Sequence, residues 1–80
     1  MIVEATFNIR RYWLKPETPR SVLDTLNYRT GSQNGLIRRY VDINYYGETD
    51  RLITMMELRY AEWILDREMI TYTVSGDDGL

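Results

Sequence analysis

The stretch Thr30–Tyr46, with the sequence TGSQNGLIRRYVDINYY, carries the clearest turn signal and the clearest strand signal in the chain. Residues 30–35 are rich in Gly, Ser, Thr and Asn, which is typical of a loop. From Leu36 the apolar and polar side chains alternate, which indicates a strand with one buried face. The predicted strand over 36–46 places Ile37, Val41, Ile43 and Tyr45 on its apolar side, and Arg38, Tyr40, Asp42, Asn44 and Tyr46 on the other.

Two further segments alternate in the same way. The first begins at Ile2 and continues to Arg10, and whether Arg11 to Leu14 extend it is left open. Its predicted core side carries Val3, Ala5, Phe7 and Ile9, and its predicted solvent side carries Glu4, Thr6, Asn8 and Arg10. The last segment begins at Met69, where apolar residues alternate with Thr71 and Thr73. Three strands are therefore expected.

Two helices are expected between these strands. Thr18 followed by Pro19 predicts an N-cap with proline at the first helical position, and a short apolar face follows over residues 22–26. A second N-cap is predicted at Thr49. The helix after it is expected to be long, because Leu52, Ile53, Met56, Tyr60, Trp63 and Ile64 form one apolar stripe at 100° per residue.

The predicted fold is α+β: a small three-stranded sheet in the order β-α-β-α-β, with both helices packed on one face. Eighty residues suffice for one domain, 1–80, in which residues 76–80 form a frayed tail. Strand order and oligomeric state stay open at this point.

Composition excludes several classes of protein. The chain contains no His and no Cys, which removes the side chains that most often carry chemistry near neutral pH, together with disulfides and thiolate metal sites. We expect no enzyme, no metal and no cofactor. No apolar run approaches the length of a membrane span, so the expected location is the cytoplasm. The net charge of −2 neither favours nor forbids contact with nucleic acid.

The first candidate binding surface is the sheet face predicted to be open. Flat Tyr and Arg side chains on it suit either a protein hot spot or the stacking of bases, whereas a merely solvated face is the alternative. The candidate residues are Arg10, Arg38, Tyr40, Asn44 and Tyr46.

The second candidate surface is a further apolar stripe on the back of the long helix. It consists of Met55, Leu58, Ala61 and Leu65. A helix with two apolar sides is usually covered on both, so the stripe predicts self-association, binding of a partner protein, or cover from the same chain.

These surfaces predict a non-enzymatic protein-binding module that inhibits or modulates a larger protein. In size and composition the chain is similar to the small accessory proteins of phages and mobile elements. The alternatives are a single-stranded nucleic-acid binder that stacks bases on Tyr40 and Tyr46, and a small homo-oligomeric structural protein, such as a homodimer joined through the long helix. Paired carboxylates such as Glu62 and Asp66 give only a weak signal for catalysis.

Overall fold

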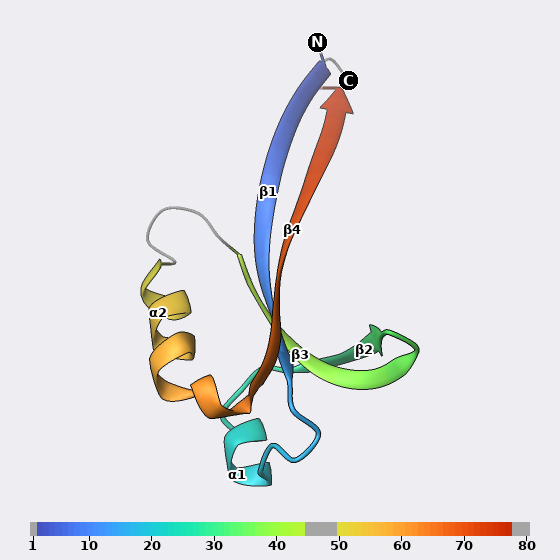
Figure 1. Cartoon of the computed structure of the whole chain (residues 1–80). Coiled ribbons are helices and arrows are strands. Elements are labelled where there is room, and N and C mark those ends of the chain that lie inside the picture. Colours follow the sequence, from blue (N-terminus) through green and yellow to red (C-terminus); the bar gives the residue numbers. More distant parts are fainter. Residues whose placement is uncertain (1, 45–49, 78–80) are drawn as a thin grey trace.

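A computed structural model describes residues 2–44 and 50–77 of the chain (Figure 1). Strand β1 (Ile2–Leu14) leads into the short helix α1 (Arg20–Leu23). Strands β2 (Arg29–Gln33) and β3 (Leu36–Asn44) follow. Helix α2 (Asp50–Arg59), the 3-10 turn η2 (Ala61–Trp63) and strand β4 (Ile64–Asp77) complete the described part of the chain.

The sheet is antiparallel and has four strands in the order β2-β3-β1-β4. The predicted three-stranded β-α-β-α-β fold is therefore wrong: a fourth strand is present, and β2 and β3 follow each other without a helix between them. The N-terminal strand pairs with the C-terminal one over its whole length, from Ile2 opposite Asp77 to Leu14 opposite Ile64. Gly76 and Asp77 thus belong to β4, and residues 78–80 of the predicted tail lie outside the described residues.

The missed strand is β2, in the segment predicted to be a loop. Only Asn34 and Gly35 turn, with φ of 53° and 80°, and they join Gln33 directly to Leu36. A two-residue Asn-Gly turn with positive φ at both positions matches the twist of a β-hairpin. The Thr, Gly and Ser before this turn have the composition of a loop, but they form the outer strand of the hairpin.

The second helix is shorter than predicted, because β4 begins inside its expected range. Helix α2 ends at Arg59, and Ile64, placed last in the predicted helical stripe, is the first residue of β4. Strand pairing with the second half of β1 overrides the local helical pattern, since it satisfies the backbone edge of β1 that β3 does not occupy. The predicted cap Thr49 lies outside the described residues.

The cap predicted for the first helix is also wrong by one residue. Pro19 occupies the N-cap position of α1 and offers no side-chain bond. The buried Thr18 instead donates its hydroxyl to the carbonyl oxygen of Lys15, at 2.6 Å, and stabilises the turn before the helix.

One face of the sheet, which we call the helix-covered face, holds the core. Tyr12 and Leu14 of β1 lie there with Val41 and Ile43 of β3 and with Ile64. The helices cover this cluster by inserting Leu23 from α1 and Met56 from α2. Neither described helix has the length and apolarity that crossing a bilayer requires.

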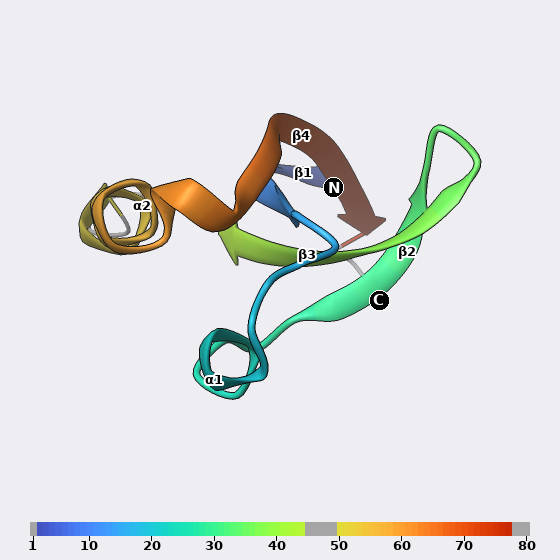
Figure 2. The same cartoon turned by 60° about the horizontal axis from the view of Figure 1, so that its bottom comes forward.

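The opposite face, which we call the open face, is the inside of a strong curl. Gln33 at the outer edge of β2 donates a hydrogen bond to a carboxylate oxygen of Asp66 in β4, with 3.0 Å between Nε2 and Oδ2. In a flat sheet these outer strands would be about 14 Å apart, at about 4.8 Å per strand interval. Figure 2 shows the β2–β3 hairpin bending away from the helices, which lie outside the curve.

Candidate functional site

The open face extends along β1 and β4 well beyond the other two strands. Among the described residues, β1 pairs with β3 as far as Ile9 opposite Asn44, and residues 2–8 of β1 pair with residues 71–77 of β4. We call this two-stranded ribbon the arm. It projects from the body, as Figure 1 shows. Its length is about 24 Å, from seven residues at ~3.4 Å each.

The arm is apolar on the side that continues the open face. Phe7 and Tyr72 lie opposite each other, with ring centroids 5.2 Å apart and planes inclined by 23°. They are 38% and 41% exposed, and Val74 beside them is 52% exposed. Ala5 completes this apolar surface, and the half-buried Ile9 and Ile70 form its base. An apolar strand face in water is what a binding partner covers.

The other side of the arm is polar and almost without charge. The Thr71 hydroxyl donates to the side-chain oxygen of Asn8 at 2.8 Å, and the hydroxyl oxygens of Thr6 and Thr73 are 3.4 Å apart. Glu4 is the single charged side chain among residues 4–8 and 71–76. Nothing in those two segments therefore resists transfer into an apolar environment as strongly as a row of charges would.

In the body, the open face carries a packed cluster built around Arg11. Its guanidinium donates two hydrogen bonds to Asp42, from Nε at 2.8 Å and from Nη2 at 2.9 Å. The same group lies 4.0 Å from the ring centroid of Tyr40 and 5.7 Å from that of Trp13. The hydrogen bond to Asp42 raises the pKa of Arg11, which keeps its charge fixed over the two rings.

Trp13 is almost fully covered although it faces away from the helices. Tyr40 packs against it with centroids 5.1 Å apart and planes at 59°, and the side chain is 4% exposed. Because the curl brings β2 over this region, Gly31 also lies close to both rings. The body part of the open face is therefore a small second core, and the arm is where the face is accessible.

The sheet-face residues predicted from the sequence do not all come together. Arg38, Tyr40 and Asn44 lie on the open face, in alternate positions of β3 that share a side with Arg11 and Trp13. Arg10 lies on the helix-covered face, because it shares the side of Tyr12. Tyr46 lies outside the described residues.

The predicted second stripe is spread over three elements. Met55 and Leu58 lie on α2, Ala61 on η2, and Leu65 at the irregular start of β4. All are exposed, with Leu58 at 80%, Leu65 at 41% and Met55 at 40%. They are no longer one helical face, since the helix ends at Arg59.

A group of charged residues links α2 to the sheet on the helix-covered face. Arg67 of β4 donates to both carboxylate oxygens of Glu57, at 2.6 Å from Nε to Oε1 and from Nη2 to Oε2. This bond lowers the pKa of Glu57. Burial raises the pKa of the fully buried Tyr12 to about 12, with the nearby Glu57 carboxylate as a further cause. Within 2–44 and 50–77, no three acidic side chains are grouped as metal ligands would be.

The sequence interpretation missed Phe7, Tyr72 and Val74 as site residues. The sequence pattern places the apolar side of residues 3–9 in the core. The three consecutive large residues at 12–14 point to both faces of the strand, so they do not indicate which face is the core. The structure buries Tyr12 and Leu14 beneath the helices, which turns the odd-numbered positions outward. The sequence does carry one sign of this arrangement: large side chains occupy both faces of β1 near its C-terminal end, so the core can lie on either face.

The family models that were compared with the chain do not match it, and neither do the curated proteins or the solved structures.

Proposed function

We propose that this protein is a non-enzymatic protein-binding module whose arm enters a cleft of a larger protein. The observation that carries the proposal is the exposed apolar side of the arm, formed around the stacked Phe7 and Tyr72. Both rings offer large, stiff contact areas, which suits the centre of a protein interface.

Within residues 2–44 and 50–77, no third strand or packing layer supports the arm. A two-stranded ribbon alone is marginally stable, and a third strand or a packing layer normally stabilises it. Beyond Asn44, within the described residues, β1 has no neighbour except β4. The apolar side and the strand edges that no described residue pairs with favour the same event, burial against another protein.

Size favours a larger partner over a second copy of this chain. One side of the arm measures about 24 by 10 Å, so two arms stacked face to face would bury roughly 500 Å² in total. Stable interfaces bury about 1,200 Å² or more. A cleft that encloses both sides and an edge of the arm buries more than twice the area of the stacked pair and reaches that value. Within residues 4–8 and 71–76, Glu4 is the one charge that must be desolvated or paired.

An arm that fills a cleft acts as an inhibitor when that cleft is the partner's functional site, and as a modulator when it lies elsewhere. The partner chemistry that fits is an apolar, uncharged cleft wall with a strand edge. The proposal includes a cytoplasmic location, which a chain without cysteines permits.

Neighbouring residues of β4 provide a matched test. Val74 lies on the apolar side of the arm and Thr73 on the polar side, and both are exposed. Val74→Asp and Thr73→Asp add the same charge one residue apart. We expect a partner captured from lysate of the source cell to be lost by Val74→Asp and retained by Thr73→Asp.

The purified pair then gives a direct measurement. We expect Val74→Asp to weaken binding at least tenfold, with a thermal midpoint close to that of Thr73→Asp. Amide hydrogens of residues 4–8 should exchange more slowly in the complex. Equal affinity of the two variants, or protection confined to the body, would remove the arm as the binding element. A doubled mass of the isolated protein in light scattering would instead identify a second copy as the occupant.

A further inference from the structure

Strand β4 lies at one edge of the sheet. It is the last strand in the order β2-β3-β1-β4, so its outer side has no neighbouring strand among the described residues. At the body end, Gln33 of β2 and Glu57 of α2 bond to Asp66 and Arg67 of β4. Residues 69–76 lie beyond these two bonds and continue into the arm. The outer edge of β4 is therefore most accessible over residues 69–76.

This edge lacks the features that normally keep edge strands apart. Soluble proteins protect such edges with Lys, Pro, charged side chains, a bulge or a short strand. Residues 69–76, MITYTVSG, contain no Lys, no Pro and no charge. The register with β1 also runs without a shift from Ile2 opposite Asp77 to Trp13 opposite Asp66. The described part of β4 thus carries no device against pairing with a further strand in the arm.

The opposite edge of the sheet is built differently. Strand β2 has only five residues. It begins with the charged Arg29 and has Gly31 at its centre. A short edge strand with a charge discourages pairing, and glycine weakens a strand. Of the two edge strands, β4 is therefore the one suited to the addition of a strand.

The side chains of β4 specify what an added strand should carry. They alternate between the apolar and the polar side of the arm, in the order Ile70, Thr71, Tyr72, Thr73, Val74 and Ser75. Pairs of aromatic with β-branched residues, and pairs of Thr with Thr or Ser, stabilise neighbouring strands. A segment that alternates apolar residues with Thr or Ser, without a charge at its centre, matches both sides.

Buried area favours a segment of a larger protein over a second copy of β4. Two copies joined edge to edge along the arm would bury about 24 by 10 Å each, or roughly 500 Å² in total. Stable interfaces bury about 1,200 Å² or more. A segment of a larger protein adds its edge contact to the cover that the same protein gives to Phe7 and Tyr72, which are 38% and 41% exposed.

We propose that the partner contributes an extended, uncharged strand that adds to the outer edge of β4 in the arm. The inference rests on the proposed function, because it names the part of the partner that the arm recognises. Main-chain hydrogen bonds along β4 supply affinity, and the two sides of the arm select the side chains. Strand addition also converts the two-stranded arm into a three-stranded sheet, which is stable in water where a ribbon is marginal.

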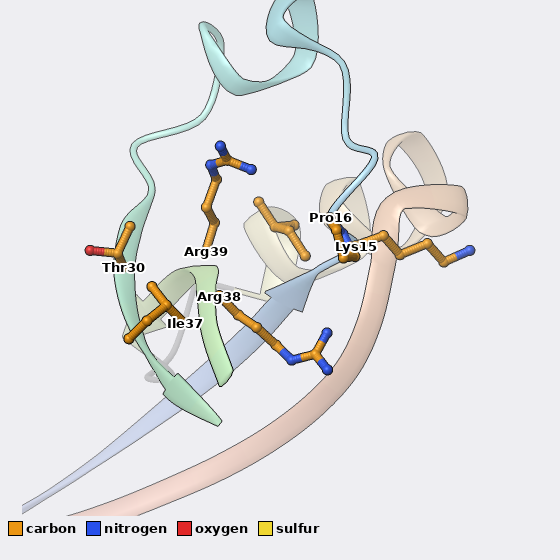
Figure 3. Close-up of a pocket in the computed structure, with 7 residues that line it drawn as sticks. Lys15, Pro16, Thr30, Ile37, Arg38 and Arg39 are labelled. Carbon is orange, nitrogen blue, oxygen red and sulfur yellow. The ribbon is translucent and has the colours of Figure 1, made fainter. Parts of the chain in front are cut away.

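The hollow at the other end of the sheet provides a reference region. It is lined by the turn after β1 and by residues of β2 and β3. In Figure 3 the side chains of Lys15, Arg38 and Arg39 point in different directions around it. The backbones of β2 and β3 pair with each other there, with Thr30 opposite Arg39. Strand addition at β4 should leave the amides of residues 37–39 unchanged.

The probe is a capped peptide, Lys-Thr-Val-Thr-Phe-Thr-Val-Lys, which alternates as the added strand should and is kept soluble by its terminal Lys residues. It is titrated into the full chain while the exchange of single backbone amides is measured by NMR. Alternate amides of residues 70–76 point away from β1 and exchange fast in the free chain. We expect these amides to become protected at saturation, whereas the fast amides of residues 2–8 and those of residues 37–39 keep their rates.

Ser75→Pro and Gly76→Pro are matched variants, because neither position places a large side chain on the apolar side of the arm. Consecutive amides point to opposite edges of a strand, so one proline removes an outward N–H and the other removes an N–H that faces β1. Fast exchange in the free chain identifies the outward position. Proline there should keep the thermal midpoint and lower peptide affinity about fivefold, which is the value of one hydrogen bond.

Protection at none of the outward amides of β4, or at those of β1 instead, would overturn strand addition at this edge. Unchanged peptide affinity in the outward proline variant would overturn it as well. In both cases the arm is still the binding element if Val74→Asp loses the partner and Thr73→Asp retains it, so the two proposals fail separately. Slow exchange at the outward amides of β4 in the free chain, together with a doubled mass in light scattering, would assign the edge to a second copy and also overturn the proposal.

Discussion

Gly31 is the position where the fold leaves no room for a side chain. A Cβ atom there would lie 2.9 Å from Cε1 and 3.5 Å from Cδ1 of Tyr40, and 3.6 Å from Cη2 of Trp13. Optimal contacts between carbon atoms are about 3.5–4.0 Å, so the first of these distances requires movement. Tyr40 cannot move freely, because Arg11 lies 4.0 Å from its ring and Trp13 packs beside it.

We therefore expect Gly31→Ala to destabilise the protein by about 1 to 2 kcal/mol. Overpacking a tight site costs about 1–3 kcal/mol, and replacing a strand glycine returns about 0.5–1 kcal/mol through the unfolded chain. For a domain of this size the midpoint of thermal unfolding should fall by roughly 4–16 °C. Circular dichroism during heating measures it.

Gly76→Ala is the matched control, because an added Cβ at Gly76 meets no atom within 4 Å. Its midpoint should be unchanged or slightly higher. Tyr40→Leu removes the ring, so adding Gly31→Ala to that variant should cost much less than in the parent chain. Equal midpoints for Gly31→Ala and Gly76→Ala would refute the close packing of β2 over Trp13 and Tyr40.

Three further predictions concern the hairpin and the ionisable residues. Gly35→Ala should lower the free energy of unfolding by about 1–2 kcal/mol, because φ is +80° there, whereas Gly35→Asn should cost less in the same denaturant titration; equal costs would contradict the turn geometry. The pKa of Tyr12 is raised to about 12 in the folded protein, so the stability from its protonated form is complete below pH 10 and is lost as the pH rises through 12. This two-unit shift corresponds to about 2–3 kcal/mol. In urea titrations between pH 9 and 12, Tyr12→Phe should therefore lose correspondingly less stability than the parent chain. The lowered pKa of Glu57 acts in the opposite direction: its ion pair with Arg67 stabilises the fold above about pH 4.5 and is lost as the pH falls through the lowered value. Glu57→Gln should therefore flatten the acid side of the stability profile by roughly 0.5–1 kcal/mol. An unchanged acid profile would contradict the ion pair.

Local patterns in the sequence predicted individual elements better than their arrangement. The alternation from Ile2 and from Leu36 and the apolar stripe after Asp50 all correspond to elements of the right type. The ends of these elements differ from the predicted ends because tertiary pairing determines where an element stops. Ile64 follows a helical sequence pattern, but it pairs with Leu14 of β1 and therefore belongs to β4. The Asn-Gly pair is a hairpin signal, but the loop predicted over residues 30–35 absorbs it.

The candidate site was harder to predict, because it depends on which side of β1 the helices cover. Alternation states that Phe7 and Arg10 lie on opposite sides, but it does not state which side is the core. The core face is the one on which Leu23 and Met56 pack with Tyr12 and Leu14, and these residues are far apart in the sequence.

The pairing of β1 with β4 also determines when the arm forms during folding. It joins residues as distant in sequence as Ile2 and Asp77, so the chain must close a very long loop before these contacts are made. The β2–β3 hairpin closes locally and has no such delay. The arm is therefore expected to form last during folding and to open first in the native protein, so its amide hydrogens should exchange faster than those of the body.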